Sequence, residues 1–208
     1  MTAIVDIYNA ALMEVGHSQA IADPSENTNA ANLCRTFYPI CRDLLLEDAD
    51  WNFATKRVVL ALLPDTQSNW AYAYAYPADG LRVRDLVLPG MRFVPHDWRP
   101  AYEVANVNSA RAILTNLADA EAVYTARVEN PNLFTSQFVS TLAYLLASRI
   151  AMPLTGKPDV AAAARQGYLL SLASARAANL GEGHAGPMPD CEFNAVRNIT
   201  TDQGWPYA

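Results

Sequence analysis

Three carboxylates, Glu47, Asp48 and Asp50, stand close together at the end of a long stretch with helical periodicity. Two carboxylates that flank a groove can act as general acid and general base in glycoside hydrolysis, and Glu14 is a further candidate for such a pair. The sequence places no nucleophile, base or positioned histidine beside them, as a catalytic site would require. We therefore expect a solvated acidic rim, or a surface that meets arginines of a neighbouring subunit, and we expect no enzymatic activity.

The cysteines and histidines form no metal-ligating pattern. Cys34 and Cys41 lie seven residues apart on one face of an expected helix, where a free thiol packs as a small hydrophobic group. Cys191 is remote from both, and the chain has neither a CxxC pair nor a histidine at ligand spacing. We expect reduced thiols, no metal and no cofactor. The histidines stand alone at His17, His96 and His184.

The composition is that of a globular protein, with 51% hydrophobic and 17% charged residues among 208. No apolar run approaches the ~20 residues that span a bilayer, and the N-terminal stretch lacks the basic residues of a signal peptide, so we expect no membrane association. The net charge of −6 arises within residues 1–50, where Arg35 and Arg42 stand against eight carboxylates. Duplex DNA binding requires a basic face, and the sequence shows none.

Tyrosines at positions 72, 74 and 76 alternate with alanines, which is the period of a β-strand. A row of aromatic rings on one face can stack on the bases of single-stranded nucleic acid. No lysine or arginine is interleaved with Tyr72, Tyr74 and Tyr76, and this favours a sheet face packed against the core.

Four stretches show the apolar spacing of amphipathic helices. The first begins at Thr2 as N-cap and ends at Gly16, and the second runs from Ser25 to about Asp48 with a kink at Pro39. Its expected buried face carries Leu44 beside the two cysteines. The third covers residues 135–151 before Pro153, and the fourth covers residues 158–179, with Pro158 in its first turn and Gly181 past its end.

The pattern in the middle of the chain predicts one small antiparallel sheet. Residues 55–63 are expected to form a strand with Val58, Leu60 and Leu62 on one face, and residues 81–88 are extended or helical. Turn residues separate the remaining runs. The other expected strands are 70–76, 102–107, 111–115 and 121–128.

The order of these elements predicts an α+β fold with three parts. Residues 1–54 and 131–180 form a helical bundle built from N- and C-terminal helices that share a core. Residues 55–130 form an inserted antiparallel β domain. Trp51 and Phe53, at the change of periodicity, are the expected plug between the two.

Residues 181–208 are rich in glycine and proline and yet contain Phe193, Trp205 and Tyr207. Such a segment cannot form a core alone. We expect an extended tail that docks through these three aromatic residues on another surface, that of another chain.

An ordered series of landmarks along residues 3–180 resembles the head-to-tail adaptor family of short-tailed phages, the tail tubular protein A type. A short helix ending at Gly16 precedes a long helix with a leucine-rich end. Further landmarks follow in the same order as in the family. They are Trp51-Asn52-Phe53-Ala54, Lys56-Arg57, Trp70, the segment from Tyr74 to Pro77, Asp79, Leu81-Arg82, Tyr124, Val128, Asn130-Pro131, Phe134, Phe138, Ile150-Ala151 and Pro153-Leu154-Thr155-Gly156.

The resemblance implies a structural virion protein that is made in the host cytoplasm. Members form a dodecameric ring below the portal protein, continue the channel for DNA ejection and accept the tail nozzle protein, without a cofactor. DNA passes through the lumen without specific binding, which suits a chain with no basic patch. The aromatic residues of the tail would then meet the portal or a neighbouring copy, and Met91, Phe93 and Trp98 would face the nozzle.

Two other functions remain open. One is a virion-associated peptidoglycan hydrolase that uses the carboxylates named above, and the other is a module that binds single-stranded nucleic acid through the Tyr72–Tyr76 face.

Overall fold

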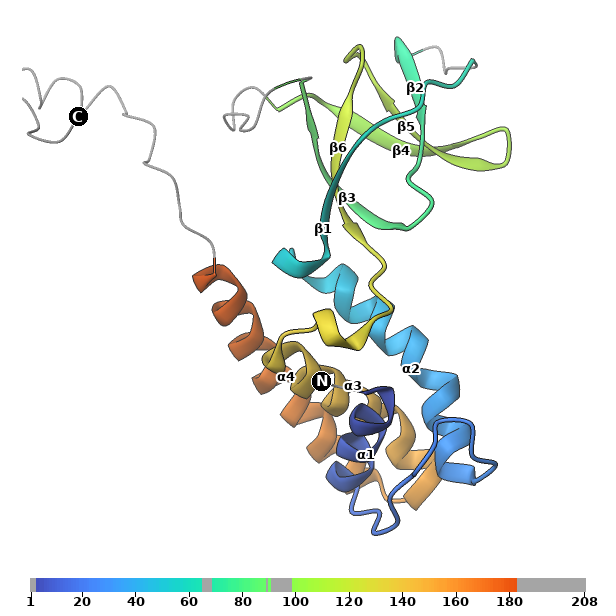
Figure 1. Cartoon of the computed structure of the whole chain (residues 1–208), viewed down its shortest axis with the longest axis vertical. Helices are drawn as coiled ribbons and strands as arrows, with labels where there is room; N and C mark the ends of the chain where they lie inside the picture. Colours follow the sequence, from blue (N-terminus) through green and yellow to red (C-terminus); the bar gives the residue numbers. More distant parts are fainter. Residues whose placement is uncertain (1–2, 65–68, 89, 91–98, 183–208) are drawn as a thin grey trace, which may run out of the picture.

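The computed structural model describes residues 3–64, 69–88, 90 and 99–182. Over this part the fold is mixed α and β, as expected, with four helices and two small antiparallel sheets (Figure 1). The helices lie at one end of the long axis and the strands at the other. The helices are α1 (Ile4–Glu14), α2 (Asn29–Asp48), α3 (Ser136–Thr155) and α4 (Pro158–Gly181).

The strands form two three-stranded sheets, and the expectation of a single sheet is wrong. One sheet has the order β1-β6-β3 and the other has the order β2-β5-β4. Residues 55–63 connect them, because Leu60 N donates to Ala120 O at 3.0 Å beside β6, and Leu63 N then donates to Ala73 O at 2.8 Å beside β2. The strands are β1 (Thr55–Val59), β2 (Tyr72–Ala75), β3 (Gly80–Val87), β4 (Tyr102–Val107), β5 (Ala110–Thr115) and β6 (Glu121–Ala126).

The two sheets enclose a small core of their own. Leu60, Tyr74, Leu86 and Ile113 are buried in it and come from both sheets. Residues 80–87 form strand β3. Of the two alternatives expected for residues 81–88, the extended one is therefore correct. Val58 and Leu62 are 38% and 61% exposed, so that only Leu60 of the expected apolar face of residues 55–63 is buried.

A second, larger core lies among the helices. Residues of all four helices belong to it, and α3 packs against α1, α2 and α4. α3 can do so because apolar side chains occupy most of its circumference. The members of this helical core include Ile7, Leu12, Cys34, Leu45, Phe138, Leu142, Leu146, Ala164 and Leu172.

The first two helices begin later than their sequences indicated. α1 has Ala3 as N-cap, one residue after the expected Thr2, and ends before Gly16, whose φ of +73° is the predicted left-handed cap. α2 has Thr28 as N-cap, whose Oγ1 accepts from Ala31 N at 3.2 Å. Ser25 is not the cap, because Asp23 accepts both its amide and its hydroxyl in a local turn.

Proline ends neither of the two helices that contain it. α2 continues through Pro39, and α3 continues through Pro153 to Thr155, so the expectation that Pro153 stops the third helix is wrong. The stop is Gly156, with φ of +68°, whose amide donates to Met152 O at 2.9 Å. The expectation that Leu44 lies on the buried face of the second helix is also wrong, because this residue is 44% exposed.

α3 is the one helix in the described ranges that is long and apolar enough to cross a membrane. Half of that stretch is buried inside the protein, which is equally the pattern of a helix at the centre of a core.

Candidate functional site at the junction of helices and sheets

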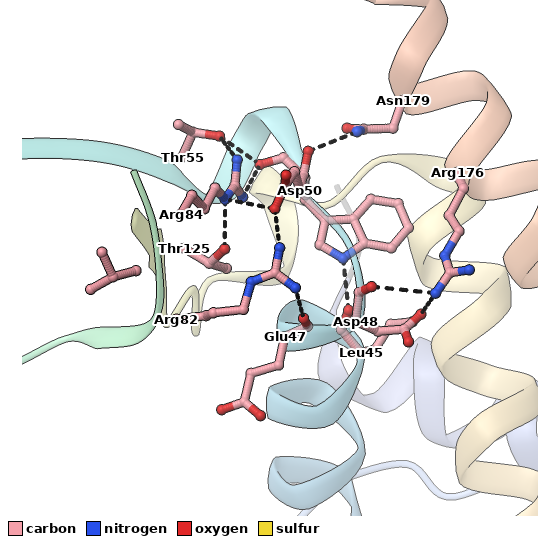
Figure 2. Close-up of polar contacts among 12 residues, drawn as sticks. Leu45, Glu47, Asp48, Asp50, Thr55, Arg82, Arg84, Thr125, Arg176 and Asn179 are labelled. Atoms are coloured by element: carbon pink, nitrogen blue, oxygen red, sulfur yellow. Dashed lines mark hydrogen bonds and ion pairs between the residues drawn. The ribbon is translucent and has the colours of Figure 1, made fainter. Parts of the chain in front are cut away.

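The acidic end of α2 lies where helices and sheets meet (Figure 2). β3 approaches it from one side and the last turns of α4 approach it from the other. A short 3-10 turn, η1 (Asn52–Ala54), follows directly and leads into β1. We call this set of contacts the junction.

Two arginines of β3 bind the end of α2. Arg82 Nη1 donates to Glu47 O at 2.9 Å, and its Nη2 forms an ion pair with Asp50 Oδ1. Arg84 lies deeper, with its side chain 11% exposed, and its Nε is 3.1 Å from the same carboxylate oxygen. Arg82 and Arg84 share this carboxylate although the pairing of β3 with β6 is irregular between Val83 and Asp85.

Arg84 also satisfies acceptors of the turn and of the sheet. Its Nε donates to Thr125 Oγ1 at 2.8 Å, its Nη1 to Thr55 Oγ1 at 2.7 Å and its Nη2 to Trp51 O at 3.1 Å. The planar guanidinium has donors in fixed directions and suits such a multiple contact better than an ammonium group. One side chain thus ties together β3, β6, the start of β1 and the end of α2.

α4 binds the same end of α2 from the opposite side. Arg176 Nη2 donates to Asp48 Oδ2 at 2.6 Å and to Asp48 O at 3.3 Å. Asn179, only 8% exposed, accepts from Asn52 N at 2.9 Å, and its Nδ2 donates to Asp50 O at 2.9 Å. Neither Arg176 nor Asn179 was singled out by the sequence.

Trp51 and Phe53 lie at the junction and face the helical core. Trp51 is fully buried, and its Nε1 donates to Leu45 O at 2.7 Å. Its ring packs against Phe53 and, edge to face, against Phe138 of α3, with centroids 6.1 and 5.1 Å apart. The backbone carbonyl of Trp51 meanwhile accepts from Arg84 and from Thr55, so this residue contacts both the helices and the sheet.

The electrostatics of the junction explain why acids occupy the wrong end of a helix. The last carbonyls of α2 have no partner within the helix and carry partial negative charge, which the carboxylates of Asp48 and Asp50 increase. α2 has no basic residue in its last turn, and Arg82, Arg84 and Arg176 supply the positive charge from other elements. Burial lowers the pKa of the Arg84 guanidinium, and Asp50 opposes that shift, which keeps the group charged.

Two of the carboxylates nominated for hydrolysis, Asp48 and Asp50, are therefore engaged in holding the fold. Asp48 and Asp50 are bound by arginines, and the side chain of Glu47 points away from them into solvent (Figure 2). Three grooves on the described surface each contain one carboxylate, namely Asp48, Glu26 or Asp79. Over the described ranges no group of three or more His, Cys, Asp or Glu side chains is arranged to hold a metal ion.

The tyrosine row belongs mainly to the core between the sheets. Tyr74 is 2% exposed, and its hydroxyl donates to Leu117 O at 2.9 Å. Tyr72 and Tyr76 are half-buried, and the hydroxyl of Tyr76 donates to Leu81 O at 3.0 Å. The guanidinium of Arg111 lies 4.0 Å from the ring centre of Tyr76 and covers that ring.

The six residues expected to dock on the portal or to face the nozzle lie outside the described ranges. They are the tail residues Phe193, Trp205 and Tyr207 and the loop residues Met91, Phe93 and Trp98.

The arginine partners of the acids were only partly visible in the sequence. The expected alternatives were solvent or arginines of another subunit, whereas the arginines belong to the same chain. An excess of carboxylates at the C-terminal end of a helix is a signal that positive charge must be supplied, but it does not identify the donors.

No family model matches the chain, and a search of curated proteins finds none with significant similarity to it.

Proposed function

We propose that this chain is a structural virion protein, a head-to-tail adaptor of a short-tailed phage. In this proposal twelve copies form a ring between the portal protein and the tail nozzle protein, and the ring continues the channel through which DNA is ejected. The protein is made in the host cytoplasm and is then assembled into the neck of the virion.

The observation on which the proposal rests is the position of the family landmarks. Trp51, Asn52 and Arg82 are landmarks of the resemblance, and all three make junction contacts through Leu45, Asn179 and Asp50. Asp79 and Tyr124 are two further landmarks, and the hydroxyl of Tyr124 donates a hydrogen bond of 2.9 Å to Asp79 Oδ1. Residues that resemble the adaptor family thus hold the helices against the sheets, which supports a shared architecture rather than a chance series.

The proposal includes a finer description of the fold. The four helices form one bundle from the two ends of the chain, residues 1–54 and 131–180, and residues 55–130 form an inserted β domain. The shared helical core and the separate core between the sheets support this division. A ring subunit needs a fixed angle between its two parts, because an error in that angle is repeated in every copy around the ring.

The charge of the chain also supports a conduit. A lumen that binds DNA tightly would hold it by counterion release, and its affinity would rise with the number of basic contacts. The net charge is −6, and nine ion pairs among the described residues neutralise many of the basic groups. We propose that DNA passes without specific binding.

Two surfaces are assigned within this proposal. Trp205 and Tyr207, with Phe193, dock on the portal or on a neighbouring copy, and Met91, Phe93 and Trp98 face the nozzle. Trp51 and Phe53 act as the plug between bundle and β domain, in keeping with their ring contacts to each other and to Phe138.

Light-scattering mass and electron microscopy of the purified full chain, alone and mixed with the portal ring of its phage, test the proposal. We expect rings, or a monomer that joins the portal as a ring. A chain that stays monomeric and does not bind the portal would refute the adaptor function. Cell-wall degradation by the wild-type chain, lost in the Glu47→Gln and Asp50→Asn variants, would instead establish the hydrolase.

A further inference from the structure

A groove of about 520 Å³ runs between α2 and α4 over the surface of α3. Its apolar lining includes Leu44, Leu145, Tyr168 and Leu169. Leu44 and Leu169 are 44% and 51% exposed, so both present apolar surface at the groove. The groove therefore presents apolar side chains in a concave setting, which is typical of a binding surface.

Two arginines in this groove have no acidic partner among the residues that the structure describes. Arg149 of α3 and Arg165 of α4 both line it, and neither forms an ion pair or hydrogen bond with any residue in the described ranges. Asp48, the one carboxylate of the lining, is bound by Arg176. An occupant that fits must therefore bring negative charge together with apolar surface.

Residues 183–208 of the same chain have this chemistry. They contain Asp190, Glu192 and Asp202 against a single arginine, Arg197. Phe193 directly follows Glu192 and is three positions from Asp190, so that acidic and aromatic groups lie within four consecutive residues.

The chain between the end of α4 and Asp190 is also long enough to reach the groove. Seventeen residues separate Arg165 from Glu182 at the end of α4, which is about 26 Å along a helix. Eight residues separate Glu182 from Asp190, and an extended chain covers about 26 Å in that length. A segment that turns back along α4 therefore brings Asp190 level with Arg165, and its attachment gives it a high effective concentration there.

We propose that residues 190–193 dock in the groove of their own chain. The carboxylates of Asp190 and Glu192 pair with Arg149 and Arg165, and Phe193 covers the exposed Leu44 and Leu169. The inference does not rest on the proposed function. If a portal or a neighbouring copy binds the same segment, that partner and the groove compete for Phe193, while Trp205 and Tyr207 stay outside the groove.

Disulfide trapping in the full chain tests the contact, because Cys191 lies within the docking segment. Leu169→Cys places a thiol in the groove, and Leu170→Cys is the matched control, 64% exposed on the same helix but outside the lining. The native Cys34 and Cys41 are fully buried and do not compete. After mild oxidation at low protein concentration, peptide mapping measures the disulfide between the introduced cysteine and Cys191.

We expect an intrachain disulfide in the Leu169→Cys variant with a yield at least about threefold above that of the control. Adding Arg149→Glu and Arg165→Glu should reduce the yield to the control level, and adding Asp190→Arg and Glu192→Arg to that protein should restore it. Equal yields at the two positions, or no response to the charge reversals, would overturn the proposal. Disulfides formed only between two chains would overturn it as well, because the occupant would then be a second copy.

Discussion

Asn52 donates two hydrogen bonds of 2.9 Å each to Asn179, 127 positions away in the chain. The amide of Asn52 donates to Asn179 Oδ1, and its side-chain Nδ2 donates to the carbonyl of Asn179. A third bond runs from Asn179 Nδ2 to Asp50 O. The last turn of α4 is thereby fastened to the residues that lead from α2 into the first strand.

Replacing Asn179 with alanine should destabilise the protein by about 1–3 kcal/mol, because it leaves the amide of Asn52 and the carbonyl of Asp50 without partners in a half-buried site. Denaturant unfolding measures the difference. The control is Leu180→Ala, at a neighbouring position that is 77% exposed, for which we expect a change within about 0.5 kcal/mol. Equal effects of the two changes would contradict this account.

Replacing Arg84 with methionine should cost more than the same change at Arg82. Arg84 is 11% exposed and serves Thr55, Thr125 and Trp51, so its loss leaves several acceptors unsatisfied and should cost about 2–4 kcal/mol. Arg82 is 43% exposed, and we expect a cost of about 1 kcal/mol or less. Hydrogen exchange of β1 should rise in the Arg84 variant, and a reversed ranking would show that burial does not govern these contacts.

Trp51→Phe should destabilise by about 1–2 kcal/mol even though an aromatic ring is retained. The change removes the Nε1 donor and leaves Leu45 O, a carbonyl in the last turns of α2, without its bond of 2.7 Å. The same change at Trp70, whose Nε1 donates to the exposed Glu103 at 3.0 Å, is the control and should have a smaller effect. Thermal unfolding of both variants provides the comparison.

Gly167 of α4 packs directly against the ring of Tyr144 in α3. A Cβ added there would be 2.7 Å from Cδ1 of the Tyr144 ring and 2.8 Å from its Cε1. Gly167→Ala should therefore destabilise by about 1–2 kcal/mol, although alanine favours helix by about 1 kcal/mol over glycine.

A double-mutant cycle isolates that clash. In a Tyr144→Ala background the obstructing ring is gone, and Gly167→Ala should then stabilise the protein by up to about 1 kcal/mol. If the substitution has the same sign in both backgrounds, the Tyr144 ring is not the obstacle.

The thiols of Cys34 and Cys41 should be unreactive in the folded protein. Burial raises the pKa of Cys34 to about 12 and that of Cys41 to about 11, and Arg149 partly opposes the second shift. Both groups therefore stay protonated near pH 8, and only the thiolate reacts. As pH rises above about 9, the unfolded chain loses these protons while the folded chain keeps them, so their contribution to stability falls until the folded pKa values are reached.

A Cys191→Ser variant makes the measurement specific to these two residues. Disulfide-exchange reagents should label two thiols per chain in concentrated guanidinium and should label them in native buffer only at the rate of unfolding. Rapid native labelling near pH 8 would show that the α2 face is open to solvent.

Local patterns in the sequence predicted the helices well, because apolar spacing and left-handed glycines are properties of neighbouring residues. Gly16 and Pro158 lie at the ends where their conformational preferences placed them. Pro153 did not end its helix, because the fold tolerates one lost donor where the helix is already closing toward Gly156. The second sheet was missed because nothing local distinguishes residues 55–59 from residues 61–63, which pair with different strands.

The junction could not be predicted because its partners are distant in sequence. Asp50, just past the end of α2, pairs with Arg82, which is 32 positions away in the sequence. Asp48 pairs with Arg176, which is 128 positions away. The sequence shows that positive charge is needed at this helix end but gives no indication that β3 and α4 converge there.

The shared helical core fixes the order in which the chain can complete its structure during synthesis. α1 and α2 leave the ribosome first, but the core that buries Ile7 and Leu45 also requires Phe138 and Leu172. The strands form a continuous stretch, residues 55–126, with a core of their own, and can close before α3 exists. The nascent chain therefore holds an apolar helix pair exposed while its β part is already folded. During that interval we expect the exposed helix pair to be the part of the growing chain most prone to aggregation.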